Sequence, residues 1–231
     1  MSESSKRRAL LALLLLVPVP SLGAWCGLEL FAGTSLGAAI FGLSKLWVVL
    51  LPLSWRVLVE RKPVSWSPAR QGGFGVAVAS GLAISAFIAG AYWLLGELLI
   101  DRALLLRELA EAGLTDPLRY GLGVAYWVFV NSVVEEYVWR WFCVRQCEAL
   151  VAPRAAVVLS ALFFTLHHIV AMAIYLDPLP VLLCSLGVFI GGLLWSWMYM
   201  RYRSIWPGWV SHAIVDVAVF GVGAFMIFGA S

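Results

Sequence analysis

Long apolar segments recur along the whole chain and leave only short polar connections between them. An apolar run of about 20 residues is long enough for a helix to cross the hydrocarbon core of a bilayer. Runs of this kind predict seven transmembrane helices, at residues 9–30, 33–54, 73–99, 120–143, 154–175, 179–200 and 207–229. Because 62% of the residues are hydrophobic and only 13% are charged, an ordinary soluble domain is excluded. The sequence therefore predicts an all-α, polytopic membrane bundle of about seven helices, within a range of six to eight.

The order of apolar and polar segments predicts two parts in the chain, an N-terminal part and a helical core. The N-terminal apolar run continues to Leu30 without an Ala-x-Ala cleavage site, which favours a retained first helix over a signal peptide. A basic loop follows the second span, and a leucine-rich stretch before the fourth span predicts an amphipathic helix along the membrane interface. We therefore predict an N-terminal part, residues 1–118, that holds three spans, this loop and this interfacial helix, and a helical core at residues 119–229.

Basic residues are distributed unevenly between the two sides of the predicted membrane. With the N-terminus in the cytoplasm, twelve lysines and arginines fall on the cytoplasmic side and three on the other side. Cytoplasmic loops of membrane proteins carry an excess of such residues. The bias predicts a cytoplasmic N-terminus and places Glu135, His168 and His212 in the cytoplasmic half of the membrane. The net charge of +3 reflects this topology and does not indicate nucleic-acid binding.

Two adjacent carboxylates and an arginine lie inside the fourth apolar segment, at Glu135, Glu136 and Arg140. An ionisable group inside a membrane costs about 2.5–3.5 kcal/mol on insertion scales and indicates a functional site. Glu136 and Arg140 are one helical turn apart and can form a pair. Glu135 lies on a different side of the helix from this pair and is suited to act as a general base. Asn131 lies one turn before Glu135 and can orient it by hydrogen bonding. The alternative is that both glutamates belong to a buried polar network that only holds helices together.

The three histidines of the chain all lie in later apolar segments. His167 and His168 are adjacent in the fifth segment, and His212 precedes Asp216 by one turn in the seventh. A neutral imidazole beside Glu135 can help to activate a water molecule or bind a metal. At this spacing Asp216 can orient the imidazole of His212, or the pair can stabilise a developing oxyanion.

Three motifs occur in order on separate apolar segments. They are Glu-Glu-x-x-x-Arg at residues 135–140, Phe-x-x-x-His at 164–168 and His-x-x-x-Asp at 212–216. Together they resemble the CPBP family, the CAAX proteases and bacteriocin-processing enzymes that are also called the ABI family. The resemblance covers residues 119–229 and marks them as the catalytic core. Ser160, four residues before Phe164, favours the register that ends at His168, although Phe163 and His167 fit the bare pattern equally.

The resemblance implies an intramembrane endopeptidase with a conical active-site cavity among helices. It implies that Glu135 activates water with help from His168, whereas His212 and residue 216 stabilise the oxyanion. The residues expected to support this site are Asn131, Glu136, Arg140, Phe164 and His167. The CAAX enzymes have asparagine where this chain has Asp216. Because an ionised aspartate cannot donate a hydrogen bond, Asp216 is expected to be protonated or to orient His212.

The sequence leaves alternatives for the cofactor, for the substrate and for the function. Catalysis without a metal is favoured because no His-Glu-x-x-His signature is present, but Glu135, His168 and His212 could supply three zinc ligands. The expected substrate is a membrane-embedded or lipid-anchored protein or peptide, such as a prenylated CAAX tail, a leader peptide or a C-terminal sorting tail. The expected location is a bacterial or archaeal inner membrane. The alternatives are a non-catalytic immunity or scaffold protein and a small proton-coupled transporter.

Overall fold

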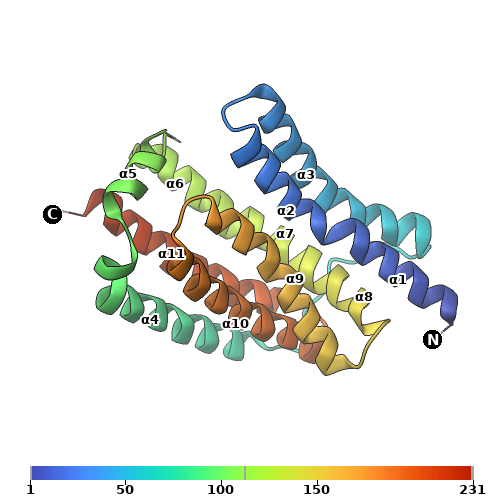
Figure 1. Ribbon diagram of the computed structural model, residues 1–231. Helices are drawn as coiled ribbons and strands as arrows, with labels where there is room; N and C mark the ends of the chain where they lie inside the picture. The colour runs from blue at the N-terminus through green and yellow to red at the C-terminus, as the bar shows by residue number, and fades with distance from the viewer. Residues whose placement is uncertain (1, 112, 230–231) are drawn as a thin grey trace.

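The described residues, 2–111 and 113–229, fold into helices and contain no strand in the computed structural model (Figure 1). The α-helices are α1 (Glu3–Leu16), α2 (Pro18–Ala24), α3 (Ser35–Ser54), α4 (Phe74–Leu99), α5 (Arg102–Glu111), α6 (Pro117–Tyr126), α7 (Ser132–Glu135), α8 (Arg145–Glu148), α9 (Pro153–Ala173), α10 (Pro178–Tyr202) and α11 (Trp206–Phe228). The π-helical segments are η1 (Trp25–Leu30), η2 (Trp55–Val59), η3 (Trp127–Asn131) and η4 (Glu136–Val144). The elements from α6 to α8 follow one another without a break and form one helical rod over residues 117–148.

Six helical segments are long and apolar enough to cross a membrane. They are Glu3–Leu30, Ser35–Val59, Phe74–Gly96, Pro153–Ala173, Pro178–Tyr202 and Trp206–Phe228. These segments coincide with six of the seven predicted spans, so the prediction of an all-helical membrane bundle is confirmed. The remaining prediction, residues 120–143, falls within the helical rod. Its asparagine, glutamates and arginine make it less apolar than the six segments named above. The count of seven spans therefore stays a prediction.

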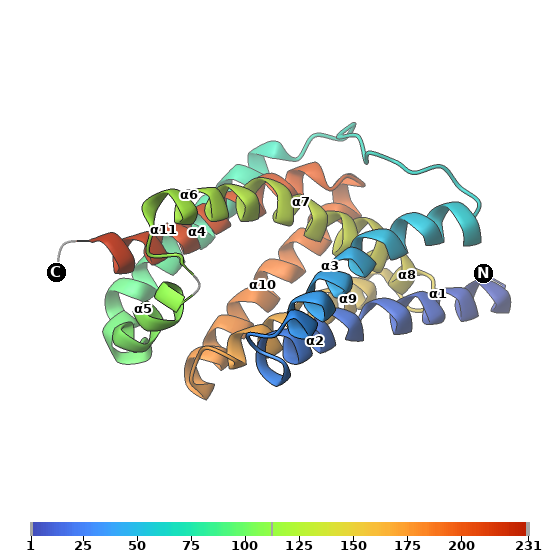
Figure 2. The same ribbon diagram turned by 90° about the horizontal axis from the view of Figure 1, so that it is seen from above.

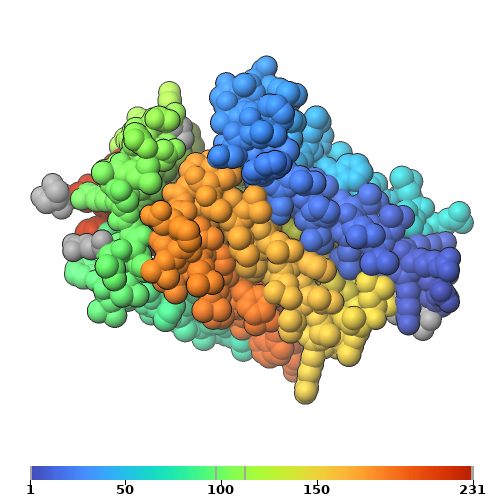
Figure 3. Space-filling view, viewed as in Figure 1, coloured from blue at the N-terminus to red at the C-terminus, as the bar shows by residue number. Residues whose placement is uncertain are grey.

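The helical rod runs through the bundle and contacts helices from both ends of the chain. Its segment η4 packs against α3, α9 and α10, while η3 and α7 pack against α11. The helices α9 and α10 form one close pair, and α4 lies along α11 (Figure 2). In the space-filling view, α1 and α2 in blue lie beside α9 in yellow and orange (Figure 3). The rod is thus enclosed by helices on several sides, which allows polar side chains to be held away from lipid.

Local sequence signals explain where several helices begin and why two of them approach closely. The Asp116 side chain accepts a hydrogen bond from the Arg119 backbone N–H over 2.9 Å, which caps α6. Prolines occupy the first positions of α6, α9 and α10, where no backbone donor is lost. Gly192 lets α10 approach α9, because a Cβ at this position would lie 3.3 Å from atoms of Ala161 and Phe164.

Two polar connections are tied to the C-terminal helices. The helix α5 forms within the predicted interfacial stretch, and its Arg102 guanidinium donates to the Met226 carbonyl over 3.0 and 2.8 Å. The connection over residues 60–73, which we call the strap, crosses from η2 to α4. The Ser204 hydroxyl donates to the Ser67 carbonyl over 2.7 Å, and the Trp206 indole donates to the Trp66 carbonyl over 3.0 Å. The strap is thereby fixed to the turn between α10 and α11.

Candidate functional site

The two adjacent glutamates lie where the helical rod changes from α7 to the π-helical segment η4. Glu135 is the last residue of α7 and Glu136 the first of η4. Asn131 ends η3, and its side-chain amide donates to the Glu135 carboxylate over 2.9 Å, as the one-turn spacing predicted. Short π-helical turns inside α-helices occur frequently at functional sites. This local geometry separates the two carboxylates and gives each its own partners.

Glu136 and Arg140 form a fully buried pair. The Arg140 Nε lies 3.5 Å from the Glu136 Oε1, and neither side chain is exposed to solvent. The Arg140 guanidinium also lies over the Phe164 ring at 4.3 Å and over the Trp195 ring at 5.3 Å. A buried charge is tolerated only when it is paired, and the faces of aromatic rings add to the stabilisation. The pair expected from the sequence is therefore present, and aromatic rings from α9 and α10, rather than further hydrogen bonds among the described residues, surround the guanidinium.

Glu136 fits against α11 because that helix has a glycine at the point of contact. A Cβ at Gly208 would lie 2.6 Å from the Glu136 Oε2. The carboxylate cannot retreat freely, since its other oxygen is held by two partners. This role of Gly208 could not be predicted from its spacing, because a glycine in an apolar helix is most often only a packing residue.

We expect Gly208→Ala to displace the Glu136 carboxylate and to lower both the stability and the activity of the protein. Overpacking of a tight interior typically destabilises by about 1–3 kcal/mol. Gly221→Ala is the matched control, because it lies on the same helix and a Cβ there would meet no atom within 4 Å. The measurement is thermal unfolding of both variants in detergent, and equal melting temperatures would contradict the proposed contact.

His212 connects α11 to both glutamates. Its Nδ1 lies 3.1 Å from the Glu136 Oε1, and its Nε2 lies 3.7 Å from the Glu135 Oε2. The same Nε2 lies 3.6 Å from the Asp216 Oδ1. Because an ionised carboxylate can only accept hydrogen bonds, the contact with Glu136 places a proton on the Nδ1 of His212. The imidazole is therefore fixed with Nε2 directed to the space between Glu135 and Asp216.

Trp195 holds the His212 ring in place. The two rings are stacked at 3.9 Å with an interplanar angle of 13°. The Trp195 indole N–H donates to the Ser211 hydroxyl over 3.1 Å, which fixes the indole on α11 as well. Trp195 could not be predicted as a site residue, because a tryptophan in an apolar segment has no distinguishing spacing.

The adjacent histidines of α9 have different surroundings. The His168 Nδ1 lies 2.9 Å from the Phe164 carbonyl, and a carbonyl can only accept, so this assignment leaves Nε2 of the neutral ring as an acceptor. His167 instead stacks on Trp139 at 5.2 Å and 7°. Ser160 fixes α9 to the helical rod, since its hydroxyl donates to the Trp139 carbonyl over 2.7 Å.

Solvent exposure separates the residues that can meet a substrate from those that cannot. The Glu135 side chain is 15% exposed and the Asp216 side chain 20%, whereas Glu136 and Arg140 are completely buried. His168 is also partly exposed. The Glu135 and Asp216 side chains are therefore partly accessible from outside the protein, whereas the Glu136–Arg140 pair beside them is enclosed by protein. The arrangement has the parts needed to activate water and to stabilise a developing negative charge.

A group of three possible metal ligands includes Glu135, His167 and His168. One ligand atom from each lies within 4.8 Å of the others among the described residues. This set contains His167 in place of His212, which the sequence suggested as the third ligand, although the His212 Nε2 lies 3.7 Å from the Glu135 Oε2. The Nδ1 of His167 is buried and has no hydrogen-bond partner in the described part of the chain. Three such ligands fit a catalytic zinc site that keeps a fourth position for water.

Comparison with known proteins identifies the part of the chain that carries this site. Residues 117–218 match a family model described as type II CAAX prenyl endopeptidase Rce1-like. The matched range contains both glutamates, Arg140 and all three histidines. No curated protein matches the chain. No solved structure matches it either.

Proposed function

Since residues 117–218 of this integral membrane protein form an Rce1-like domain of the CPBP family, we propose that the site around Glu135 hydrolyses a peptide bond in a membrane-associated substrate. The observation that carries the proposal is the position of Glu135, which is oriented by Asn131, partly exposed, and 3.7 Å from the His212 imidazole. An oriented carboxylate that water can reach, beside a fixed imidazole, is suited to general-base catalysis.

The proposed reaction begins with a water molecule between Glu135 and His168. Glu135 takes a proton from this water as the oxygen attacks the scissile carbonyl carbon, and the Nε2 of His168 accepts a hydrogen bond from the same water. When the tetrahedral intermediate collapses, the carbon–nitrogen bond breaks and the proton passes from Glu135 to the leaving amine. A carboxylate that accepts and then returns one proton is sufficient for both steps.

The tetrahedral intermediate carries an oxyanion that must be stabilised. We assign this role to His212, whose Nε2 in the protonated ring donates to the oxyanion. Glu136 and Trp195 hold the ring from two directions, so it needs no reorganisation during the reaction. Asp216 lies 3.6 Å from the same Nε2 and is proposed to orient and charge the imidazole rather than to donate a hydrogen bond itself.

Substitution of Asp216 tests this assignment. We expect Asp216→Asn to retain activity, because the amide also fits beside the imidazole and can donate to the oxyanion. We expect Asp216→Ala to lose most of the activity, since neither role is then filled. The measurement is the initial rate of peptide hydrolysis by the two variants and the wild type. Equal rates for all three proteins would remove Asp216 from the mechanism.

We propose that the reaction proceeds without a metal ion, with zinc on Glu135 and two histidines as the alternative. A zinc ion held there would polarise the carbonyl and lower the pKa of its bound water. Metal analysis of the purified wild type and of Glu135→Ala distinguishes the two. Stoichiometric zinc in the wild type that is lost in the variant would establish the metal mechanism.

The substrate is proposed to be a lipid-anchored or membrane-embedded protein or peptide. A prenylated CAAX tail is the first candidate, because the matched family is named for that substrate. Leader peptides and C-terminal sorting tails are also compatible with a site among membrane helices. The test compares the peptide termini in membranes of cells that express the wild type or Glu135→Ala at equal levels. Termini found only with the wild type would identify the substrate, and identical termini would favour a non-catalytic binding protein.

A further inference from the structure

A polar cavity lies at the end of the bundle where α1 begins, and its wall contains none of the candidate-site residues. Its volume is about 310 Å³, and its walls come from α1, from η2 with the start of the strap, and from α8. The spans Glu3–Leu30 and Ser35–Val59 both reach their polar ends here. The cavity therefore lies at the level where apolar helices give way to polar chain, which is the level of lipid headgroups in a membrane.

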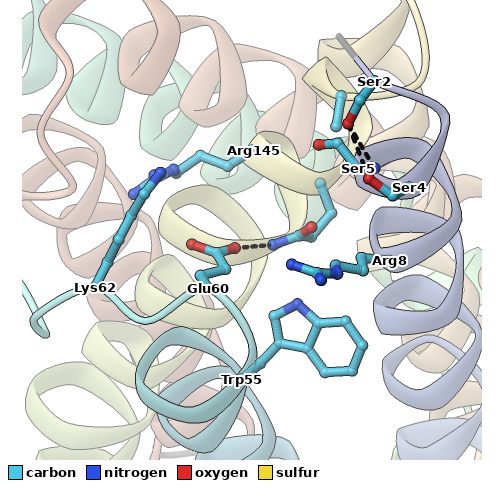
Figure 4. Close-up of a pocket in the computed structure, with 10 residues that line it drawn as sticks. Ser2, Ser4, Ser5, Arg8, Trp55, Glu60, Lys62 and Arg145 are labelled. Atoms are coloured by element: carbon cyan, nitrogen blue, oxygen red, sulfur yellow. Dashed lines mark hydrogen bonds between the residues drawn. The ribbon is translucent and has the colours of Figure 1, made fainter.

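Three cations from three separate elements line this cavity. They are Arg8 of α1, Lys62 of the strap and Arg145 of α8. Figure 4 shows Lys62 and Arg145 on one side of the cavity, with Arg8 approaching from the other. Within the described residues, no carboxylate oxygen lies within 4.0 Å of a nitrogen of any of these three side chains. Their charges are therefore available to an anion.

Among the described residues of the cavity wall, the one acidic side chain, Glu60, is already paired with other groups. The Glu60 carboxylate accepts from the Arg56 guanidinium over 2.6 Å and from the Gln146 side-chain amide over 2.9 Å. Burial alone would raise the pKa of Glu60, but these two hydrogen bonds and the charges of Arg145 and Arg56 lower it instead. Glu60 is therefore ionised, and its charge is paired with that of Arg56. A net positive charge remains in the cavity.

Hydroxyl groups and one aromatic ring complete the wall. Ser2, Ser4 and Ser5 line the cavity at the N-terminus of α1, where the helix dipole favours negative charge. The indole of Trp55 is buried and closes the cavity on the side of the apolar helices. Cations and hydroxyls towards the polar end, with an aromatic ring towards the apolar end, match the two parts of a phospholipid.

We propose that this cavity binds the phosphate group of an anionic phospholipid headgroup. Basic pockets between transmembrane helices are suited to such headgroups, because lysine and arginine charges at the membrane surface attract anionic lipids. The phosphate oxygens would accept from Arg8, Lys62 and Arg145 together. Since Arg145 belongs to the helical rod that also carries Glu135, a bound lipid would connect the first two membrane helices to the rod.

The test measures binding of phosphatidylglycerol to the purified full-length protein by native mass spectrometry, with phosphatidylcholine as the neutral comparison lipid. We expect the wild type to retain phosphatidylglycerol preferentially. We expect Lys62→Gln and Arg145→Gln each to weaken that binding about fivefold, in line with the usual contribution of one basic residue at a membrane surface. Arg70→Gln is the matched control, because Arg70 belongs to the same strap but does not line the cavity, and it should bind as the wild type does.

A competition experiment distinguishes a lipid phosphate from a soluble phosphate compound as the ligand of the cavity. Inorganic phosphate and glycerol phosphate are added as competitors at millimolar concentration, and neither should displace the lipid. Displacement by either compound would assign the cavity to a soluble phosphate and overturn the lipid proposal. Equal retention of both lipids, or an equal loss in Arg70→Gln, would also overturn it. Melting temperatures of the variants confirm that weaker binding does not come from unfolding. The result is independent of proteolytic activity, which is assayed separately.

Discussion

Replacing Glu135 by glutamine is expected to lower the rate of peptide-bond hydrolysis by about 100-fold or more, in the range typical of a lost general base. The amide has nearly the same shape as the carboxylate, and its oxygen can still accept the hydrogen bond from Asn131. It cannot take a proton from water at neutral pH. The fold should therefore persist while the chemical step fails. The measurement is the initial rate of cleavage by purified protein in detergent, with the peptide that the wild type cleaves.

Glu111→Gln is the control for this experiment. Glu111 ends α5, is exposed, and lies outside the matched range of residues 117–218. This variant makes the same chemical change as Glu135→Gln and should keep the wild-type rate. A rate for Glu135→Gln within tenfold of the wild type, with an unchanged melting temperature, would show that Glu135 is not the base.

Arg140→Met is expected to have the largest effect on stability, with a loss of about 3–5 kcal/mol in the free energy of unfolding. The substitution leaves the Glu136 carboxylate charged and fully buried without its guanidinium partner. It also removes the cation that lies over the Phe164 and Trp195 rings. Equilibrium unfolding in detergent micelles gives the free energy, and the activity of the variant should fall together with its folded fraction.

A double variant distinguishes an unpaired buried charge from simple loss of packing. Glu136→Gln combined with Arg140→Met removes both charges and leaves a side-chain oxygen to accept from His212. We expect the double variant to recover most of the lost stability, because no uncompensated charge remains in the interior. Arg154→Met, at an exposed position near the start of α9, should change the stability by less than about 0.5 kcal/mol. A double variant as unstable as Arg140→Met would assign the loss to packing.

Contacts within one helix were predictable from the sequence because helical spacing fixes them. Asn131 and Glu135 are four residues apart and share a hydrogen bond, and Glu136 and Arg140 are four residues apart and form a pair. The apolar runs likewise predicted six segments that form long helices. In each case the relevant partner is near in sequence, so the period of the helix is enough to find it.

Contacts between distant helices could not be predicted in the same way. Nothing in the spacing indicated that His212 would contact Glu136, that Trp195 would stack on the imidazole, or that Gly208 would make room for the carboxylate. These contacts depend on how α10 and α11 pack against the helical rod. The motif resemblance gave the order of the polar residues along the chain but not their pairing. The conical cavity and the roles of the site residues stay predictions.

The buried pair in the helical rod has a consequence for how the protein is made. Each ionisable group opposes entry of a nascent helix into the bilayer by about 2.5–3.5 kcal/mol, and this helix carries Glu135, Glu136 and Arg140. The pairing of Glu136 with Arg140 is available as soon as the helix forms, whereas His212 is synthesised 76 residues after Glu136. Until α11 is made, the Glu136 carboxylate therefore lacks its imidazole partner and depends on Arg140. The polar cluster is complete only after α11 has packed against the rod, so assembly of the candidate site follows synthesis of α11.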